Sequence, residues 1–203
     1  LPSRDWKQRR WKKPWYPGET VIAGIGQGYH LTTPLQLVTA TAMLANGGRR
    51  IEPRLVEAIR DPFSHAWQPL PPTVHGQVKI DPANLAEVRE GMLDVMRPGG
   101  TAVVAAAGAV YAIAGKTGTA QVVGIKQGAR YDESKLARHH RDHALFIAYA
   151  PADDPKIAIA VLVENGGHGG GTAAPIARAV MDYYLTGKRP GTMKLEATSD
   201  GAD

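Results

Sequence analysis

The stretch Ala112-Ile-Ala-Gly-Lys116-Thr117-Gly118-Thr119-Ala-Gln121 decides the fold, because the remaining segments are arranged around it. It begins with small and β-branched residues, contains no proline and is typical of a strand. Side chains alternate between the faces of a strand, so Thr117 and Thr119 share one face. The long side chain of Lys116 extends from the opposite face. Gly118 removes a side chain where a ligand could approach the backbone. These four residues are the candidate site.

Two known motifs contain Gly-Lys-Thr. A phosphate loop, G-x-x-x-x-G-K-[ST], requires glycine at position 110, which is Val110, and a helix where residues 119–123 are extended in character. The phosphate loop is therefore disfavoured. The K-T-G box of serine β-lactamases and penicillin-binding proteins lies on a strand, as predicted here. The tripeptide alone does not separate that box from an incidental Lys-Thr-Gly on a surface strand.

Composition limits the possible classes of protein. The chain has 203 residues and a hydrophobic fraction of 43%, which suits one domain or a large part of one. It has no cysteine, which excludes disulfides and thiolate chemistry. Its longest small and apolar stretch, residues 102–115, is too short and too often broken by glycine to cross a bilayer. Because it begins at Leu1 without a signal peptide, we expect a piece of a longer protein.

The first twenty residues hold six basic and two acidic side chains, interleaved with aromatic residues. Residues 4–16 could form a nucleic-acid or membrane-surface binding module. Pro14 and Pro17 argue against one continuous amphipathic helix. We favour an exposed loop with Trp6, Trp11 and Trp15 partly buried against the domain and the Lys and Arg head groups in solvent.

Helix signals flank the central strand. Thr33 and Asp81, each followed by proline, predict two helix starts. A third, short helix is expected over residues 101–107, and Thr172 is expected to cap a final helix. The predicted inner faces are Leu35, Val38, Ala42 and Ala45 in the first helix and Leu85, Val88, Met92 and Val95 in the second. Residues 51–59 read as a short extended segment, followed by a proline-rich connection to residue 80.

Two strands are predicted after the central one, over residues 144–150 and 156–163, joined by a turn at 151–155. Successive strands with short links predict an α+β fold, with an antiparallel sheet flanked by helices. His139, His140 and His143 do not match a zinc motif, so no metal and no cofactor is expected. Residues 166–171 are expected to form a mobile loop, and residues 186–203 a disordered tail.

The order of elements and several motifs resemble the C-terminal half of the transpeptidase domain of class B penicillin-binding proteins, and the elongation-specific enzymes most of all. The resemblance covers residues 1–185. It rests on the Trp-rich basic stretch 6–16, the Gly-Ile-Gly-Gln-Gly sequence at 24–28, Thr33-Pro34, the K-T-G segment 115–121, Arg141-Asp-His143 and the Val-Glu-Asn-Gly-Gly sequence at 163–167. It implies the C-terminal part of a β-lactamase/transpeptidase-like serine acyltransferase fold.

The resemblance implies a peptidoglycan D,D-transpeptidase that acts on stem peptides ending in D-Ala-D-Ala and is acylated by β-lactams. Lys116, Thr117, Gly118 and Thr119 would be catalytic, with Lys116 and Thr117 on the substrate carboxylate and the Thr119 N–H in the oxyanion hole. A membrane-embedded glycan polymerase would be a partner. The enzyme would lie at the periplasmic face of the bacterial inner membrane, held by an anchor outside this chain, with no nucleic acid bound.

The family's nucleophile lies in S-x-x-K and its proton shuttle in S-x-N. Neither motif includes any of the four serines, Ser3, Ser64, Ser134 and Ser199. The chain would therefore supply one wall of the active site and would not acylate alone. A class A β-lactamase or a septal transpeptidase shares the box, but residues 6–16 and 24–28 favour the elongation-specific enzymes.

Overall fold

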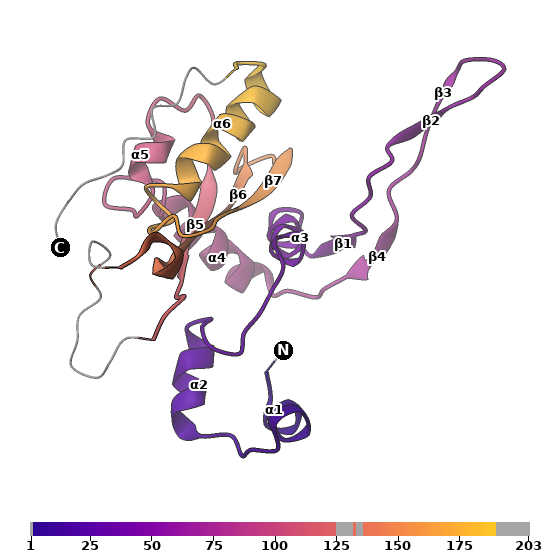
Figure 1. Ribbon diagram of the computed structural model, residues 1–203. Coiled ribbons are helices and arrows are strands. Elements are labelled where there is room, and N and C mark those ends of the chain that lie inside the picture. The colour runs from indigo at the N-terminus through magenta and orange to yellow at the C-terminus, as the bar shows by residue number, and fades with distance from the viewer. Residues whose placement is uncertain (1, 125–131, 133–135, 190–203) are drawn as a thin grey trace.

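The computed structural model describes residues 2–124, 132 and 136–189, and its centre is a three-stranded antiparallel sheet (Figure 1). The strands are β5 (Ala114–Ala120), β6 (His143–Ala150) and β7 (Ile157–Val163), with β6 in the middle. Lys116 pairs with Ile147, and Ala148 pairs with Ile159. The predicted strands and their pairing are confirmed.

Helices cover both faces of this sheet. Phe146 and Ala148 of β6 are buried in one core with Met181 of α6 (Ala173–Thr186), while Tyr149 is buried in another with Ala45 and Met92. Ala45 belongs to α3 (Pro34–Ala45) and Met92 to α4 (Pro82–Asp94). The short helix α5 (Val103–Ala106) packs against α6. The alternation along β6 therefore separates two helical layers, and the predicted α+β class is confirmed.

The predicted caps of α3 and α4 are confirmed, and α6 begins after Thr172 as predicted, but the Thr172 side chain does not cap it. Thr33 Oγ1 accepts a hydrogen bond from the Gln36 N–H, and the Asp81 carboxylate accepts from the Ala83 N–H. Thr172 precedes α6, but its hydroxyl donates to Gly166 O at 2.8 Å instead of capping the helix. The hydroxyl thus ties the preceding loop to the helix start.

The predicted inner faces of α3 and α4 are wrong at two positions. Leu35 is 58% exposed and Val88 is 47% exposed. The neighbouring Arg89 is half-buried and donates to Leu44 O and Ala45 O at the end of α3. The Arg89 guanidinium binds carbonyls that the end of α3 leaves unpaired, so Arg89 lies on the inner face of α4 with Met92, and Val88 faces outward.

The N-terminal segment is helical, so the predicted loop is wrong. It forms α1 (Arg4–Trp11), capped by Ser3, and α2 (Pro17–Gly24), which starts at a proline. Pro14 lies between the two helices, in agreement with the prediction that no continuous helix forms. Trp6 and Trp15 are half-buried, but they contact Tyr29 and Thr20 of the N-terminal segment itself, and Trp11 is 51% exposed. The predicted burial of the tryptophans against the rest of the domain is not confirmed.

Lys7 contradicts the prediction that every basic head group is in solvent. It is 1% exposed and forms an ion pair with Glu19 of α2. Its ammonium also lies 4.2 Å from the ring centroid of Tyr16 and 5.7 Å from that of Tyr29. The hydrogen bond from Lys7 lowers the pKa of Glu19. A buried ammonium needs such partners, and here they join α1, α2 and the segment after α2.

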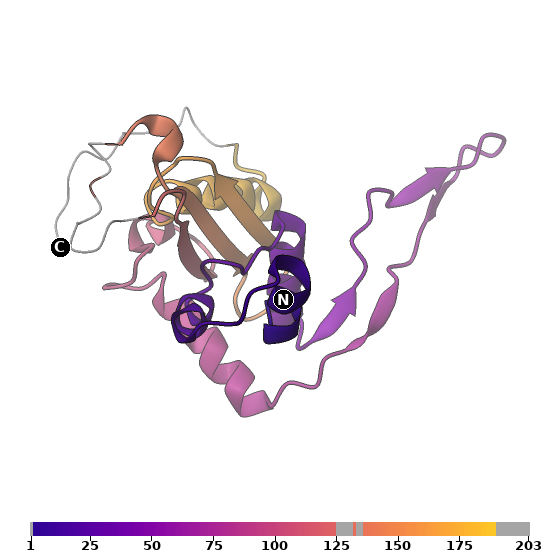
Figure 2. The same cartoon turned by 60° about the horizontal axis from the view of Figure 1, so that its bottom comes forward.

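A long arm projects from the body between α3 and α4 (Figures 1 and 2). At its base β1 (Arg49–Ile51) pairs with β4 (Val74–Gln77), and farther out β2 (Ala58–Arg60) pairs with β3 (Trp67–Pro69). The sequence predicted an extended segment and a proline-rich connection but not this pairing. The separate short runs carry no alternating pattern long enough to indicate a ribbon.

The remaining chain includes the 3₁₀ helix η2 (Arg138–His140). Among the described residues there is no group of three His, Cys, Asp or Glu side chains that could hold a metal ion. Across the same part of the chain, the helices are all too short or too polar to cross a membrane. The predicted disordered tail lies mostly outside the described residues, and the domain boundary at residue 185 stays a prediction.

Candidate active site

The K-T-G strand β5 is the edge strand of the sheet, and its outer edge carries the candidate site. Thr117 and Thr119 pair with Phe146 and Ala144, which are buried on the α6 side, so the two threonines share that face as predicted. Lys116 pairs with Ile147 and leaves from the opposite face. Lys116 is exposed, and its Nζ reaches the outer edge and donates to Thr117 O at 2.8 Å.

A second side chain binds the same edge from far away in the sequence. Gln27 Nε2 donates to Thr119 O at 2.8 Å. In an antiparallel pair, successive residues alternate between directing both backbone groups to the partner and directing both away from it. Since Thr117 and Thr119 are two residues apart, their N–H groups face the same outer edge as their carbonyls. The edge therefore presents the two N–H groups in alternation with the two carbonyls, both of which already accept hydrogen bonds, and the Thr119 N–H lies between them.

Thr101 binds the hydroxyl of the K-T-G threonine. Its Oγ1 lies 2.9 Å from Thr117 Oγ1, and either hydroxyl can be the donor. Thr101 follows the turn that ends with Gly100, just before α5. If Thr101 donates, the Thr117 hydroxyl keeps its own proton for an anionic ligand.

The glycine-rich loop 166–171 lies directly on the K-T-G strand. A Cβ added at Gly169 would be 2.1 Å from Leu145 O and 2.7 Å from Gly118 O. A Cβ added at Gly170 would be 2.1 Å from Thr101 O. These approaches are closer than any side chain permits, so glycine is required where the loop crosses the strand.

Two other motifs singled out in the sequence hold this loop in place. The N–H of Asn165 donates to His143 Nδ1 at 2.9 Å, and the Asn165 side chain donates to Arg141 O at 2.8 Å. The Gly167 N–H donates to Asp142 O, and Asp142 itself is buried. The loop predicted to be mobile is thus hydrogen-bonded to the start of β6, and this places Gly169 and Gly170 over the site.

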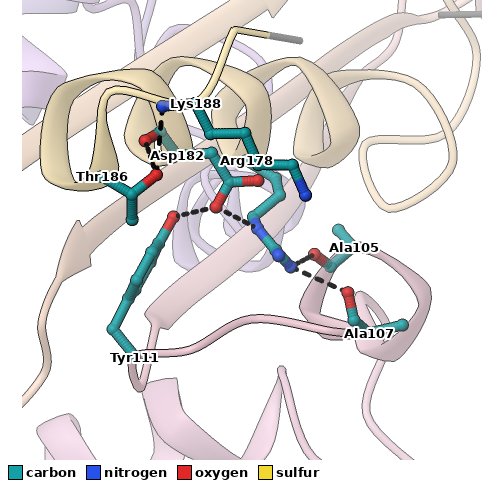
Figure 3. A network of polar contacts seen from close by, with 7 residues as sticks. All are labelled: Ala105, Ala107, Tyr111, Arg178, Asp182, Thr186 and Lys188. Carbon is teal, nitrogen blue, oxygen red and sulfur yellow. Dashed lines mark hydrogen bonds and ion pairs between the residues drawn. The ribbon is translucent and has the colours of Figure 1, made fainter. Parts of the chain in front are cut away.

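A polar network fixes the approach to β5 from the other end (Figure 3). The Tyr111 hydroxyl donates to Asp182 Oδ1 at 2.7 Å, and Arg178 Nε donates to the same oxygen at 2.8 Å. Arg178 also donates to the carbonyls of Ala105 and Ala107. Burial raises the pKa of Tyr111, and its hydrogen bond to Asp182 raises it further.

Two opposing effects act on the pKa of the Asp182 carboxyl. Burial alone would raise the pKa of Asp182, but the hydrogen bonds from Arg178 and Tyr111 outweigh burial and lower it below its ordinary value of 3.8. The carboxylate therefore stays ionised and holds α6 to the turn that leads into β5.

The sequence predicted four of the residues that meet here, Lys116, Thr117, Gly118 and Thr119, and missed Gln27, Thr101, Gly169 and Gly170. Gln27 is the only residue with a hydrogen-bonding side chain within the glycine-rich stretch 24–28, which was a usable signal. Thr101 had no such signal, because an isolated threonine after a turn is common on protein surfaces.

Comparisons with known proteins agree on one family. Residues 4–182 match the penicillin-binding protein transpeptidase domain. The chain is 41% identical over 196 residues to the peptidoglycan D,D-transpeptidase MrdA of Haemophilus influenzae, covering 96% of this chain and 30% of that protein. It is also 41% identical over 190 residues to MrdA of Escherichia coli, covering 92% of this chain and 29% of that protein. The chain thus spans less than a third of these curated relatives.

The fold comparison points to the same group. A crystal structure of Pseudomonas aeruginosa PBP2 in complex with WCK 5153 matches with a TM-score of 0.74 and 45% identity, over 92% of this chain and 38% of that one. A Helicobacter pylori PBP2 in complex with MreC matches with a TM-score of 0.68 and 28% identity, over 92% of this chain and 31% of that one. The central sheet and its helices are therefore those of this fold.

Proposed function

Since the chain belongs to the transpeptidase domain family of penicillin-binding proteins, we propose that it forms the K-T-G wall in the active site of an elongation-specific peptidoglycan D,D-transpeptidase. The observation that carries the proposal is the outer edge of β5, where Lys116, Thr117 and two outward N–H groups meet. The substrate would be a stem peptide ending in D-Ala-D-Ala. The nucleophilic serine would come from an S-x-x-K motif outside these 203 residues.

The substrate carboxylate suits Lys116 and Thr117. The ammonium of Lys116 supplies the positive charge, and the Thr117 hydroxyl supplies a directed hydrogen bond when Thr101 donates to it. An extended peptide can lie along the open edge of β5, where backbone groups are accessible. Gly118 keeps that approach free of a side chain. β-Lactams that carry a carboxylate would use the same groups.

The reaction proceeds through a serine ester. The serine oxygen attacks the carbonyl of the penultimate D-Ala, and the carbonyl oxygen becomes an oxyanion. The Thr119 N–H and the serine N–H donate to that oxyanion, which stabilises the transition state more than the ground state. The C–N bond to the terminal D-Ala breaks, and its nitrogen takes up the proton that the serine hydroxyl gave up. An amine from a neighbouring stem then attacks the ester, and the serine oxygen leaves with a proton from that amine. This forms the cross-link and frees the serine.

The family also suggests a partner and a cellular location for this protein. One relative is seen with MreC, and another belongs to a peptidoglycan synthase complex that couples polymerisation to cross-linking. For this protein we propose a membrane-embedded glycan polymerase as partner, at the periplasmic face of the inner membrane. Residues 4–16 are a poor nucleic-acid platform, because Lys7 is buried and the ring of Trp6 packs on Tyr29 at 5.4 Å.

The test is covalent labelling with a fluorescent penicillin. We expect the chain alone to remain unlabelled and the complete enzyme, with its S-x-x-K serine, to be labelled. Lys116→Ala in the complete enzyme should slow acylation by about 10²–10³-fold, the loss expected when a preorganised charge is removed from an active site. Lys156→Ala is the matched control, because this exposed lysine lies in the β6–β7 turn and pairs only with Asp154 in the described chain.

Two outcomes would count against the proposal. If the isolated chain were labelled, the nucleophile would lie within it and the assignment of an external serine would be wrong. If the complete enzyme were not labelled, or if Lys116→Ala labelled as fast as Lys156→Ala, the K-T-G wall would have no part in acylation.

A further inference from the structure

Gln27 connects the N-terminal helices to the K-T-G strand across 92 positions of sequence. We propose that Gln27 is a positioning residue that holds the Thr119 end of β5 in the geometry needed for the oxyanion hole. This inference rests on the proposed function, because it assigns Gln27 a role in the same acylation step. Gln27 acts through Thr119 and need not touch the substrate.

The first support is the placement of the hydrogen bond. Thr119 directs its N–H and C=O to the same outer edge, and Gln27 Nε2 binds the C=O at 2.8 Å. An oxyanion held by the Thr119 N–H would lie near the negative end of that carbonyl dipole. A donor on the carbonyl offsets this repulsion and fixes the rotation of the edge peptide. The Thr117 carbonyl is bound in the same way by Lys116 Nζ.

The second support is the rigid mounting of Gln27. The Gln27 N–H donates to Ile22 O at 3.1 Å at the end of α2. Its neighbours Gly26 and Gly28 have φ values of +76° and +70°, which favour glycine. At Gly28 an added Cβ would also be 2.8 Å from Ile22 Cγ2. A turn whose backbone favours glycine on both sides of Gln27 directs this one polar side chain at β5.

The third support is a set of contacts from α1 to residues before and after this turn. The Lys7 ammonium binds Glu19 of α2 before the turn, and it lies 5.7 Å from the ring centroid of Tyr29 directly after the turn. Trp6 packs on the same Tyr29 ring. Because Lys7 is 1% exposed, water does not compete for these contacts. The contacts of α1 therefore hold both ends of the segment that carries Gln27.

The test compares Gln27→Glu and Gln27→Met in the complete enzyme. Both side chains are close to glutamine in size and lack the N–H donor, and glutamate also places a carboxylate against the Thr119 carbonyl. Gln68→Glu is the matched control, because Gln68 is exposed on β3 in the arm. We expect the first-order acylation rate constant at saturating β-lactam to fall about tenfold or more in both variants, glutamate more than methionine. The dissociation constant of the initial noncovalent complex should stay unchanged.

A boronic acid gives a second readout, because its tetrahedral adduct with the serine places an oxygen in the oxyanion hole. Its affinity should fall by about the same factor as the acylation rate constant in each variant. Gln68→Glu should match the wild type in both measurements. Parallel losses in rate and boronate affinity, with noncovalent binding intact, are the signature of a positioning residue.

Three outcomes would count against the positioning role of Gln27, and each identifies a different cause. If wild-type enzyme acylates but both variants keep its rate constant, the positioning role is wrong while the proposed function stands. If a variant loses its folded circular dichroism signal together with labelling, Gln27 is a structural residue and the inference is overturned. If the wild type itself does not acylate, the proposed function fails first and the inference falls with it.

Discussion

At the scale of single residues, the site depends on positions where a side chain is absent. Gly169 lies over the hydrogen-bonded pair formed by Gly118 and Leu145, and its missing Cβ lets the loop contact the strand backbone. The atoms that an added Cβ would meet are carbonyl oxygens of the sheet. They cannot move without breaking ladder hydrogen bonds, so the close approach depends on glycine at this position.

Gly169→Ala should lower the free energy of unfolding by about 1–3 kcal/mol, the usual range for overpacking a tight site. Gly91→Ala is the matched control, because Gly91 lies in α4 with nothing within 4 Å of an added Cβ. That substitution should raise stability by about 0.5–1 kcal/mol through helix propensity. Urea unfolding of the two variants measures both values. Equal effects of the two substitutions would show that the loop does not need this contact.

Residue-scale prediction from sequence worked where partners are close along the chain. The alternation of Lys116, Thr117 and Thr119 on β5 follows from strand geometry alone and was confirmed. Lys7 was missed, because its carboxylate partner Glu19 is twelve positions away and a lysine within a basic run is usually solvated. Gln27 was missed for the same reason, since its acceptor lies in a different element.

At the scale of elements, α6 is held to the sheet by packing and to the turn before β5 by charge. Met181 and Ala177 of α6 are fully buried against the sheet. Asp182, one residue after Met181, accepts from both Tyr111 and Arg178, and Arg178 reaches back to the carbonyls at α5. The network lies at the end of α6 far from its glycine-rich start, so it sets the direction of the helix.

Asp182 should make stability depend on pH in acid. Its folded pKa is lowered below 3.8, so the carboxylate stabilises the fold above that value, and this contribution is lost as the pH falls through the folded pKa. Asp182→Asn should therefore be less stable than the wild type at pH 7 by about 1–3 kcal/mol. The difference should shrink below pH about 3.8, where the wild-type carboxyl becomes protonated.

Urea unfolding between pH 7 and pH 2 measures that difference. Asp153→Asn is the control, because Asp153 is exposed in the β6–β7 turn. Its stability should follow the wild type across the range. A gap between Asp182→Asn and the wild type that stayed constant down to pH 2 would mean that the charge of Asp182 does not stabilise the helix.

Elements were predicted from sequence where their end signals are local. Proline after Thr33 and Asp81 located two helix starts correctly. The inner face of α4 was predicted incorrectly, because periodicity favours Val88 while Arg89 gains more by binding the free carbonyls of α3. Periodicity does not report such an interaction between two helices. The same limit applies to Thr172, whose hydroxyl found an acceptor in the loop.

At the scale of the whole molecule, the three-layer body and the arm are separate in their packing. The body holds the buried residues of both cores, whereas residues in the arm are largely exposed, among them Leu55 at 104% and Phe63 at 92%. The arm joins the body at a narrow base, where the Val78 N–H donates to Gly48 O at 2.8 Å. The sequence indicated extended chain here, but its pairing could not be predicted, since exposed ribbons lack an apolar face.

This separation predicts that the arm can be removed without unfolding the body. Ile51 and Val74 are Cα partners at the base, so an Asn-Gly turn can replace residues 52–73 and close the β1–β4 pair as a hairpin. The unfolding free energy should change by no more than about 0.5 kcal/mol, because the deleted residues bury little apolar surface.

Gly48→Ala is the contrasting variant: its φ is +97° and its Cβ would lie 2.4 Å from Val78 O. That variant should destabilise the chain although it changes a single residue. If removal of the arm destabilised the chain more than Gly48→Ala does, the arm would be part of the folded core and not an appendage to it.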